Sequence, residues 1–200
     1  MIDKTILADI YRYWFGENDP VTGLPAKDRV DMWFKQSDAV DAHIRENFAR
    51  YLEPAKTAEW NLAALSREEQ VALLVLLDQF PRNLFRQSAE AFAYDAKARE
   101  IARALIGGWR TFRIFEQGFV MLPFEHSEDI ADQDYSVMLF AERAVEAPEA
   151  TKDGPRNGID FATKHLDIVR KFGRFPHRNA MLGRESTPEE VEFLKAGRGF

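Results

Sequence analysis

Apolar residues recur at helical spacing along most of the chain, and no segment alternates between apolar and polar residues as a half-buried strand would. Between residues 40 and 52 the apolar positions follow one another at every fourth residue: Val40, Ile44, Phe48 and Leu52. A spacing of three to four residues places side chains on one face of an α-helix. Since this periodicity dominates from end to end, the sequence predicts an all-α fold.

Capping residues divide this pattern into about eight helices. Ser66 with Glu69 forms a capping box, and Thr187, Pro188 and Glu190 form another before the last helix. We expect loops over 17–25 and 148–157, where Gly, Pro and polar residues gather. The expected helices cover about 3–15, 29–52 with a break near Ser37, 66–80, 88–107, 110–122, 128–146, 159–172 and 187–197. Short connections favour antiparallel neighbours, and we expect one domain over residues 1–200.

The composition narrows the classes of function. The net charge is −6, so the chain has no general basic surface for nucleic acid. It has no cysteine and its N-terminus lacks the pattern of a signal peptide, which favours a cytoplasmic protein. The longest apolar run, Val71 to Leu77, is far shorter than the roughly 20 residues that a membrane helix needs. We therefore expect neither a nucleic-acid partner nor a membrane.

The first polar motif ends the most apolar helix, over residues 76–86. Asp78, Arg82 and Arg86 are spaced four residues apart, and Pro81 is expected to kink or end the helix. Arg82, Asn83 and Arg86 are candidates for binding an anion. The alternative is structural, because a carboxylate at the edge of a core must be paired, and an ion pair from Asp78 to Arg82 or Arg86 would fix the helix end.

The second motif covers residues 121–128 at a junction between two helices. His126 lies beside Glu125, and a loop histidine next to a carboxylate can act as a general base near neutral pH. The junction also precedes a helix N-terminus, where backbone N–H groups can hold an anion. The alternative is that Ser127 caps the next helix and His126 packs against Phe124.

The third motif, residues 170–179, is the basic cluster of an acidic chain. Arg174 and Arg178 could grip a carboxylate or phosphate, with Asn179 beside them, and His177 is a second candidate acid or base. The alternative is an internal clasp, in which these cations pair with the acidic residues between 125 and 134.

Signatures of other chemistry are missing from the sequence. There is no HExxH, CxxC, phosphate-binding glycine loop or GxSxG. His165 shares a helical face with apolar residues and is expected in the core, and His43 lies among charged residues and is expected in solvent. We therefore predict no metal and no cofactor.

Taken together, the motifs resemble an uncharacterised bacterial family, the domain-of-unknown-function 924 family. The resemblance rests on Leu77–Asn83, Pro123–Glu128 and Gly173–Asn179, supported by Tyr13–Gly16 and Trp33–Phe34. It implies helix pairs stacked in a tetratricopeptide-like superhelical array around a concave groove. It implies no activity.

Three hypotheses about function remain open. The first is a binding module whose arginine-lined groove takes an anionic peptide or small metabolite. The second is a hydrolase- or lyase-like enzyme in which His126 or His177 works with Glu125 or Asp78. The third is a structural or interaction protein in which the three motifs only clamp helix junctions.

Overall fold

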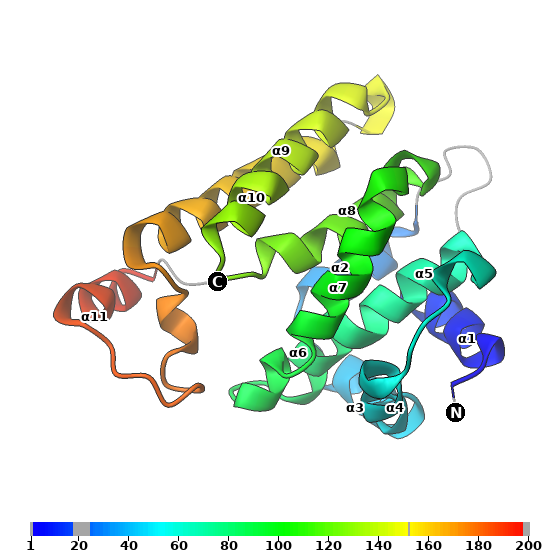
Figure 1. The fold of residues 1–200 in the computed structure, drawn as a ribbon, viewed down its shortest axis with the longest axis horizontal. Coiled ribbons are helices and arrows are strands. Elements are labelled where there is room, and N and C mark those ends of the chain that lie inside the picture. Colours follow the sequence, from blue (N-terminus) through cyan, green and yellow to red (C-terminus); the bar gives the residue numbers. More distant parts are fainter. Residues whose placement is uncertain (1, 18–24, 152, 198–200) are drawn as a thin grey trace. The chain divides into compact units, whose positions relative to one another are not determined.

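The computed structural model describes residues 2–17, 25–151 and 153–197, and within these ranges the chain is helical with no β-strand (Figure 1). The predicted all-α class is therefore confirmed. The expected count of about eight helices is too low, because the described residues form eleven α-helices and several short 3-10 or π turns.

The described residues group into two compact units. Unit 1 comprises residues 1–86 and 90–120, and unit 2 comprises 87–89 and 121–200. The single domain therefore stays a prediction, and each unit is described by itself. The helices of unit 1 are α1 (Lys4–Phe15), α2 (Lys27–Phe34), α3 (Asp38–Asn47), α4 (Leu52–Thr57), α5 (Arg67–Leu74), α6 (Phe80–Leu84) and α7 (Asp95–Leu105). Those of unit 2 are α9 (Ile130–Glu146), α10 (Asp153–Phe172) and α11 (Pro188–Lys195), while α8 (Ile114–Glu125) has residues in both units.

Unit 1 is built around α5. The predicted capping box is present, with Ser66 and Glu69 each bonded to the other's backbone N–H. From Val71 to Leu77 every side chain is buried, and α1 packs along α5. Aromatic rings complete the core, since Trp14 contacts both Phe80 and Phe119 edge-on. The all-apolar run is thus the central helix that its composition predicts.

Pro81 was expected to kink or end the helix, and near it the chain changes its type of helix without leaving the helical conformation. A π-helical segment, η3 (Val75–Gln79), follows α5 directly, and α6 starts at Phe80 with Pro81 in its first turn. Proline is tolerated in a first turn because the N–H it lacks has no partner there. Single π-helical turns are frequent at functional sites. This one contains the buried Asp78.

Unit 2 is dominated by α9 and α10, which run antiparallel and side by side (Figure 1). Their approach is close, because a Cβ added at Gly158 would lie 2.8 Å from the Phe140 ring. The predicted loop over 148–157 is wrong, since η6 (Glu149–Thr151) occupies its start and α10 already begins at Asp153. The sequence suggested that Pro155 lies in a loop. It lies instead in the first turn of α10, where a proline does not disrupt the helix.

The helix expected from Ser88 starts later, because a 3-10 turn (Ala89–Phe92) precedes α7 at Asp95, and the other boundaries are closer to expectation. The break near Ser37 is present, because Ser37 caps α3 after α2 has ended at Phe34. Asp129 caps α9 and moves its start to Ile130, while Ser127 accepts a hydrogen bond from the Asp129 N–H. The predicted loop over 17–25 falls almost wholly outside the described residues. None of the helices in the described ranges is long and apolar enough to cross a membrane.

Candidate functional site

The first motif lies in unit 1 and holds its arginines in ion pairs. Arg82 makes two parallel hydrogen bonds to Asp95, of 2.9 and 3.1 Å, and its Nη1 lies 3.5 Å from Asp78 Oδ1. Both carboxylates are buried. Asp78 and Asp95 hold the pKa of Arg82 above its ordinary value, against the effect of burial.

The other two residues of that motif converge on one carboxylate of α3. Asn83 Nδ2 donates to Asp41 Oδ1 at 2.8 Å, and Arg86 binds both oxygens of Asp41 at 2.7 and 3.0 Å. Burial raises the pKa of Asp41, but the hydrogen bonds from Arg86 and Asn83 outweigh it and lower the pKa. The motif therefore ties α6 to α3 and α7.

The third motif, in unit 2, is bound by α11 rather than by the acidic residues 125–134 alone. Arg174 makes a bidentate pair with Glu190 at 2.7 and 2.8 Å, and Asn179 Nδ2 donates to Glu190 at 3.2 Å. These bonds lower the pKa of Glu190 to about 2, the Arg174 bond having the largest effect. One pair of the expected clasp is Arg170 with Asp134, which lie 2.9 Å apart.

The buried ring of Phe175 connects the second and third motifs. The guanidinium carbon of Arg178 lies 4.5 Å from its centroid, and the rings of His165 and His177 lie 5.5 and 5.6 Å away. The Phe175 N–H donates to Glu128, which also pairs with Arg184. Unit 2 thus brings the two predicted histidine segments into one cluster.

The Glu125 carboxylate faces His165 within this cluster. Glu125 Oε1 lies 3.2 Å from His165 Nδ1, which is also 2.8 Å from the Phe161 carbonyl oxygen. The ring of His126 is 6.5 Å from that of His165. Burial lowers the pKa of His165 to about 3, helped by the charges of His126, Arg178 and His177. As predicted, His165 is a core residue.

This lowered pKa predicts a pH-dependent stability. His165 is neutral in the folded chain, whereas an unfolded histidine binds a proton near pH 6.5. Protonation therefore favours unfolding, and the stabilisation is complete above about pH 6.5 and falls as the pH drops toward 3. We expect the stability of the wild type relative to His165→Gln to decrease below about pH 6.5 and to stay constant above it. Urea unfolding from pH 4 to 8 measures this, and a difference independent of pH would contradict it.

The expected pairs Asp78–Arg82 and Arg170–Asp134 are present, but the main partners of the other arginines are carboxylates that the sequence did not suggest. Arg82, Arg86 and Arg174 each have a carboxylate partner within the chain. Their roles in binding, and the enzyme hypothesis with His126, His177, Glu125 and Asp78, stay predictions. Among the described residues, no group of three or more His, Cys, Asp or Glu side chains could hold a metal ion.

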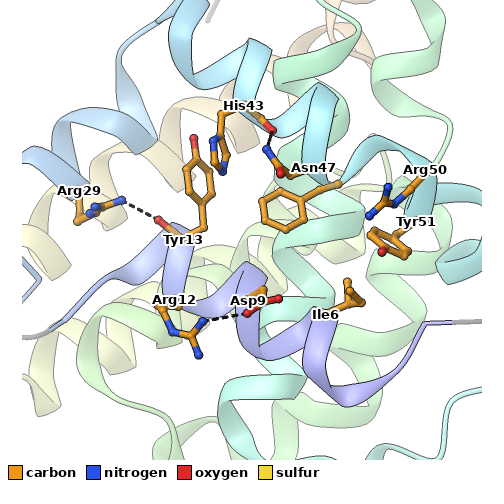
Figure 2. Close-up of a pocket in the computed structure, with 10 residues that line it drawn as sticks. Ile6, Asp9, Arg12, Tyr13, Arg29, His43, Asn47, Arg50 and Tyr51 are labelled. Atoms are coloured by element: carbon orange, nitrogen blue, oxygen red, sulfur yellow. Dashed lines mark hydrogen bonds and ion pairs between the residues drawn. The ribbon is translucent and has the colours of Figure 1, made fainter.

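A hollow of about 370 Å³ lies elsewhere in unit 1, on residues that the motifs do not include (Figure 2). One side comes from a single face of α1, with Arg29 of α2 beside it. The other side comes from α3 and the turn η1 (Ala49–Tyr51) that follows it. Its α1 residues are Ile6, Asp9, Arg12 and Tyr13, and its α3–η1 residues are His43, Asn47, Phe48, Arg50 and Tyr51.

Positive charge exceeds negative charge around this hollow. Three arginines line it, Arg12, Arg29 and Arg50, against one carboxylate, Asp9, which pairs with Arg12 at 2.9 Å. Arg29 donates to the Tyr13 carbonyl oxygen, and its Nε lies 3.8 Å from the carboxylate of the exposed Asp28. In the ranges that the structure describes, Arg50 has an aromatic contact, to Tyr51, and no ion pair. In an acidic chain, this hollow is thus a local excess of positive charge.

Sequence reasoning missed this hollow. Its residues come from three segments, and only the fold brings these together. His43 is exposed as predicted, but its ring stacks on Tyr13 with centroids 4.1 Å apart. The one available signal was the spacing of Ile6, Asp9 and Tyr13 on one face of α1.

The described chain is thus an all-helical protein with polar residues locked at its helix junctions and one arginine-rich hollow. It belongs to the family described as bacterial protein of unknown function (DUF924), which it matches over residues 10–198. The expected membership is therefore confirmed.

A solved structure agrees with this assignment. The chain is similar to a protein of unknown function, ATU0120, from Agrobacterium tumefaciens, with 35% sequence identity and a TM-score of 0.80. The match covers 96% of this chain and 98% of that one. No curated protein matches the chain.

Proposed function

We propose that this protein binds a small organic anion in the hollow between α1 and α3. The observation that carries the proposal is the set of three arginines, Arg12, Arg29 and Arg50, around a concavity with one carboxylate. A volume of about 370 Å³ is within the usual range of roughly 300–1,000 Å³ for small-molecule sites. The expected ligand class, an anionic metabolite or peptide end, is the one that the sequence suggested, but its site is different.

The ion pairs of the three motifs support this choice of site. A guanidinium that already makes a bidentate pair with a buried carboxylate must break that pair before it can hold a ligand, as Arg174 would with Glu190. Arg50 and Arg12 are exposed, and they would give up at most an exposed pair, which contributes little. A stacked, tetratricopeptide-like arrangement of helix pairs would place such a groove between neighbouring helices, and it remains part of the proposal.

Titration calorimetry with small carboxylates and phosphates tests the site. In a double variant, Arg12→Gln with Arg50→Gln, we expect the Kd of any anion that binds the wild type to rise at least about tenfold, because charged hydrogen bonds are lost. The matched control is Arg170→Gln, whose exposed ion pair to Asp134 is also 2.9 Å long but lies outside the hollow. We expect its Kd to change less than about twofold.

Two results would contradict the proposal. One is a panel in which no anion binds or raises the melting temperature, since a ligand at 100 times its Kd adds about 2.7 kcal/mol to the stability. The other is an equal loss of affinity in the Arg170→Gln control, which would mean that the affinity depends on the total charge of the protein and not on the hollow.

A further inference from the structure

Two stacked pairs face the same hollow, Tyr13 with His43 and Arg50 with Tyr51, and the proposed binding of an anion uses the Arg50 guanidinium but none of the rings. The rings of Tyr13 and His43 are stacked, with an interplanar angle of 14°. On another side, the guanidinium carbon of Arg50 lies 4.9 Å from the centroid of the Tyr51 ring. Figure 2 shows these pairs apart from each other, with Ile6 near the second. Each pair presents a flat surface next to a cation.

These surfaces are accessible. His43 and Arg50 are exposed, and Tyr51 is half-buried. Tyr13 is held in place, because its ring also contacts the buried Phe48, with centroids 5.7 Å apart. A ring that is fixed by the core and stacked on an exposed partner loses little conformational freedom when a ligand packs against the pair.

The size and lining of the hollow also favour a ligand that is larger and more apolar than an inorganic anion. Phosphate or sulfate would fill a small part of about 370 Å³ and would leave the half-buried Ile6 in contact with water. A ligand with an apolar, planar portion would cover this side chain while its charged end reaches the arginines. Flat rings pack well on Tyr, His and Arg surfaces because all of these have accessible π faces.

We infer that the anion bound in this hollow carries a flat aromatic or heteroaromatic ring, which packs on the Tyr13–His43 and Arg50–Tyr51 surfaces while its carboxylate or phosphate meets the arginines. This inference rests on the proposed function and specifies its ligand. Two ligand classes share this chemistry: aromatic carboxylates and nucleoside monophosphates.

Matched probe pairs test the inference on the full chain. Adenosine monophosphate is compared with ribose 5-phosphate, and phenylpyruvate with pyruvate, by titration calorimetry. Each pair keeps the anion and removes the ring. We expect the ring-bearing member of at least one pair to bind about tenfold more tightly than its partner, as expected for one stacked ring. The pair that shows the preference identifies the class.

A double variant, His43→Leu with Tyr51→Leu, removes the exposed ring of the first pair and the ring of the second, and keeps apolar volume. We expect it to abolish the preference for the ring-bearing probe while the Kd of the ring-less anion changes less than about twofold. The control is Phe34→Leu, an exposed ring of unit 1 outside the hollow, which should keep the full preference. Far-UV circular dichroism verifies that each variant is folded. If the double variant is not, the single His43→Leu change at an exposed position takes its place.

The outcomes separate the two proposals. If ribose 5-phosphate or pyruvate binds as tightly as its ring-bearing partner in both pairs, the inference about the ring is wrong and the anion site stands. If none of the four probes binds, the anion site itself is wrong. A preference that survives in both the double and the single variant would also overturn the inference, because the ring would then bind elsewhere.

Discussion

Replacing Arg82 with alanine is expected to lower the free energy of unfolding by about 3–5 kcal/mol. The guanidinium of Arg82 compensates two buried carboxylates, Asp78 and Asp95, and also donates to the Asp78 carbonyl oxygen. Asp78 is 1% exposed, so water cannot replace the lost cation there. Removing one partner of a buried ion pair leaves the other as an uncompensated charge, and this is the origin of the large effect.

Urea unfolding followed by tryptophan fluorescence measures this change. The four tryptophans all belong to unit 1, as Arg82 does, so their emission reports on the correct part of the chain. Arg12→Ala is the control, because its ion pair with Asp9 is exposed, and we expect a loss within about 0.5 kcal/mol. If Arg82→Ala lowered the free energy of unfolding by less than about 1 kcal/mol, the triad of Asp78, Arg82 and Asp95 would not be a stabilising buried ion-pair cluster.

A triple variant distinguishes the charge from the packing. With Asp78→Leu, Arg82→Met and Asp95→Leu together, none of the three positions carries a charge. Replacing a whole buried ion-pair cluster by apolar residues is often neutral or stabilising. We therefore expect the triple variant to be more stable than Arg82→Ala alone. If it were less stable, the specific hydrogen bonds of the triad, and not the compensation of charge, would account for the effect.

Local signals predicted the helices well where a cap or an apolar face lies within a few residues. Ser66 and Thr187 each begin a helix as expected, because a side-chain cap depends on the next three residues alone. The predicted loop around Pro155 was wrong, and at Pro81 the helix changes type instead of ending. Both prolines stand in a helix, since their place in a first turn depends on where the helix starts, and a distant packing partner decides that.

The candidate site was harder to predict for the same reason. The motifs suggested arginines available to a ligand, but the partners of Arg86 and Arg174, Asp41 and Glu190, lie 45 and 16 residues away. Sequence spacing cannot show such pairs. Nor could it show that His43 stacks on Tyr13, 30 residues away. The sequence predicted which residues share a helix face, because local periodicity determines this. It did not predict which residues tertiary packing brings together.

The second large effect is expected at Phe175, the buried ring of unit 2. Phe175→Ala should lower the free energy of unfolding by about 3–5 kcal/mol, as is usual for a large aromatic residue removed from a core. Phe175 is fully buried against Ile168 and Val169, and Arg178 and His165 contact its ring. The cavity would thus remove apolar burial and also the surface on which a buried guanidinium rests.

Hydrogen exchange of the α10 amides and far-UV circular dichroism measure this loss, because unit 2 contains no tryptophan. Phe161→Ala is the matched control: this ring lies on the same helix as Ile168 but is 50% exposed, and we expect a change within about 0.5 kcal/mol. Phe175→Leu should fall between the two, because it keeps most of the volume and loses the ring. Phe175→Ala could instead lower the free energy of unfolding by no more than the Phe161 control does. In that case the cluster of Phe175, His165 and Arg178 would not be what holds the turn η7 (Pro176–Arg178) against α10. The third motif would then depend on the Arg174–Glu190 ion pair.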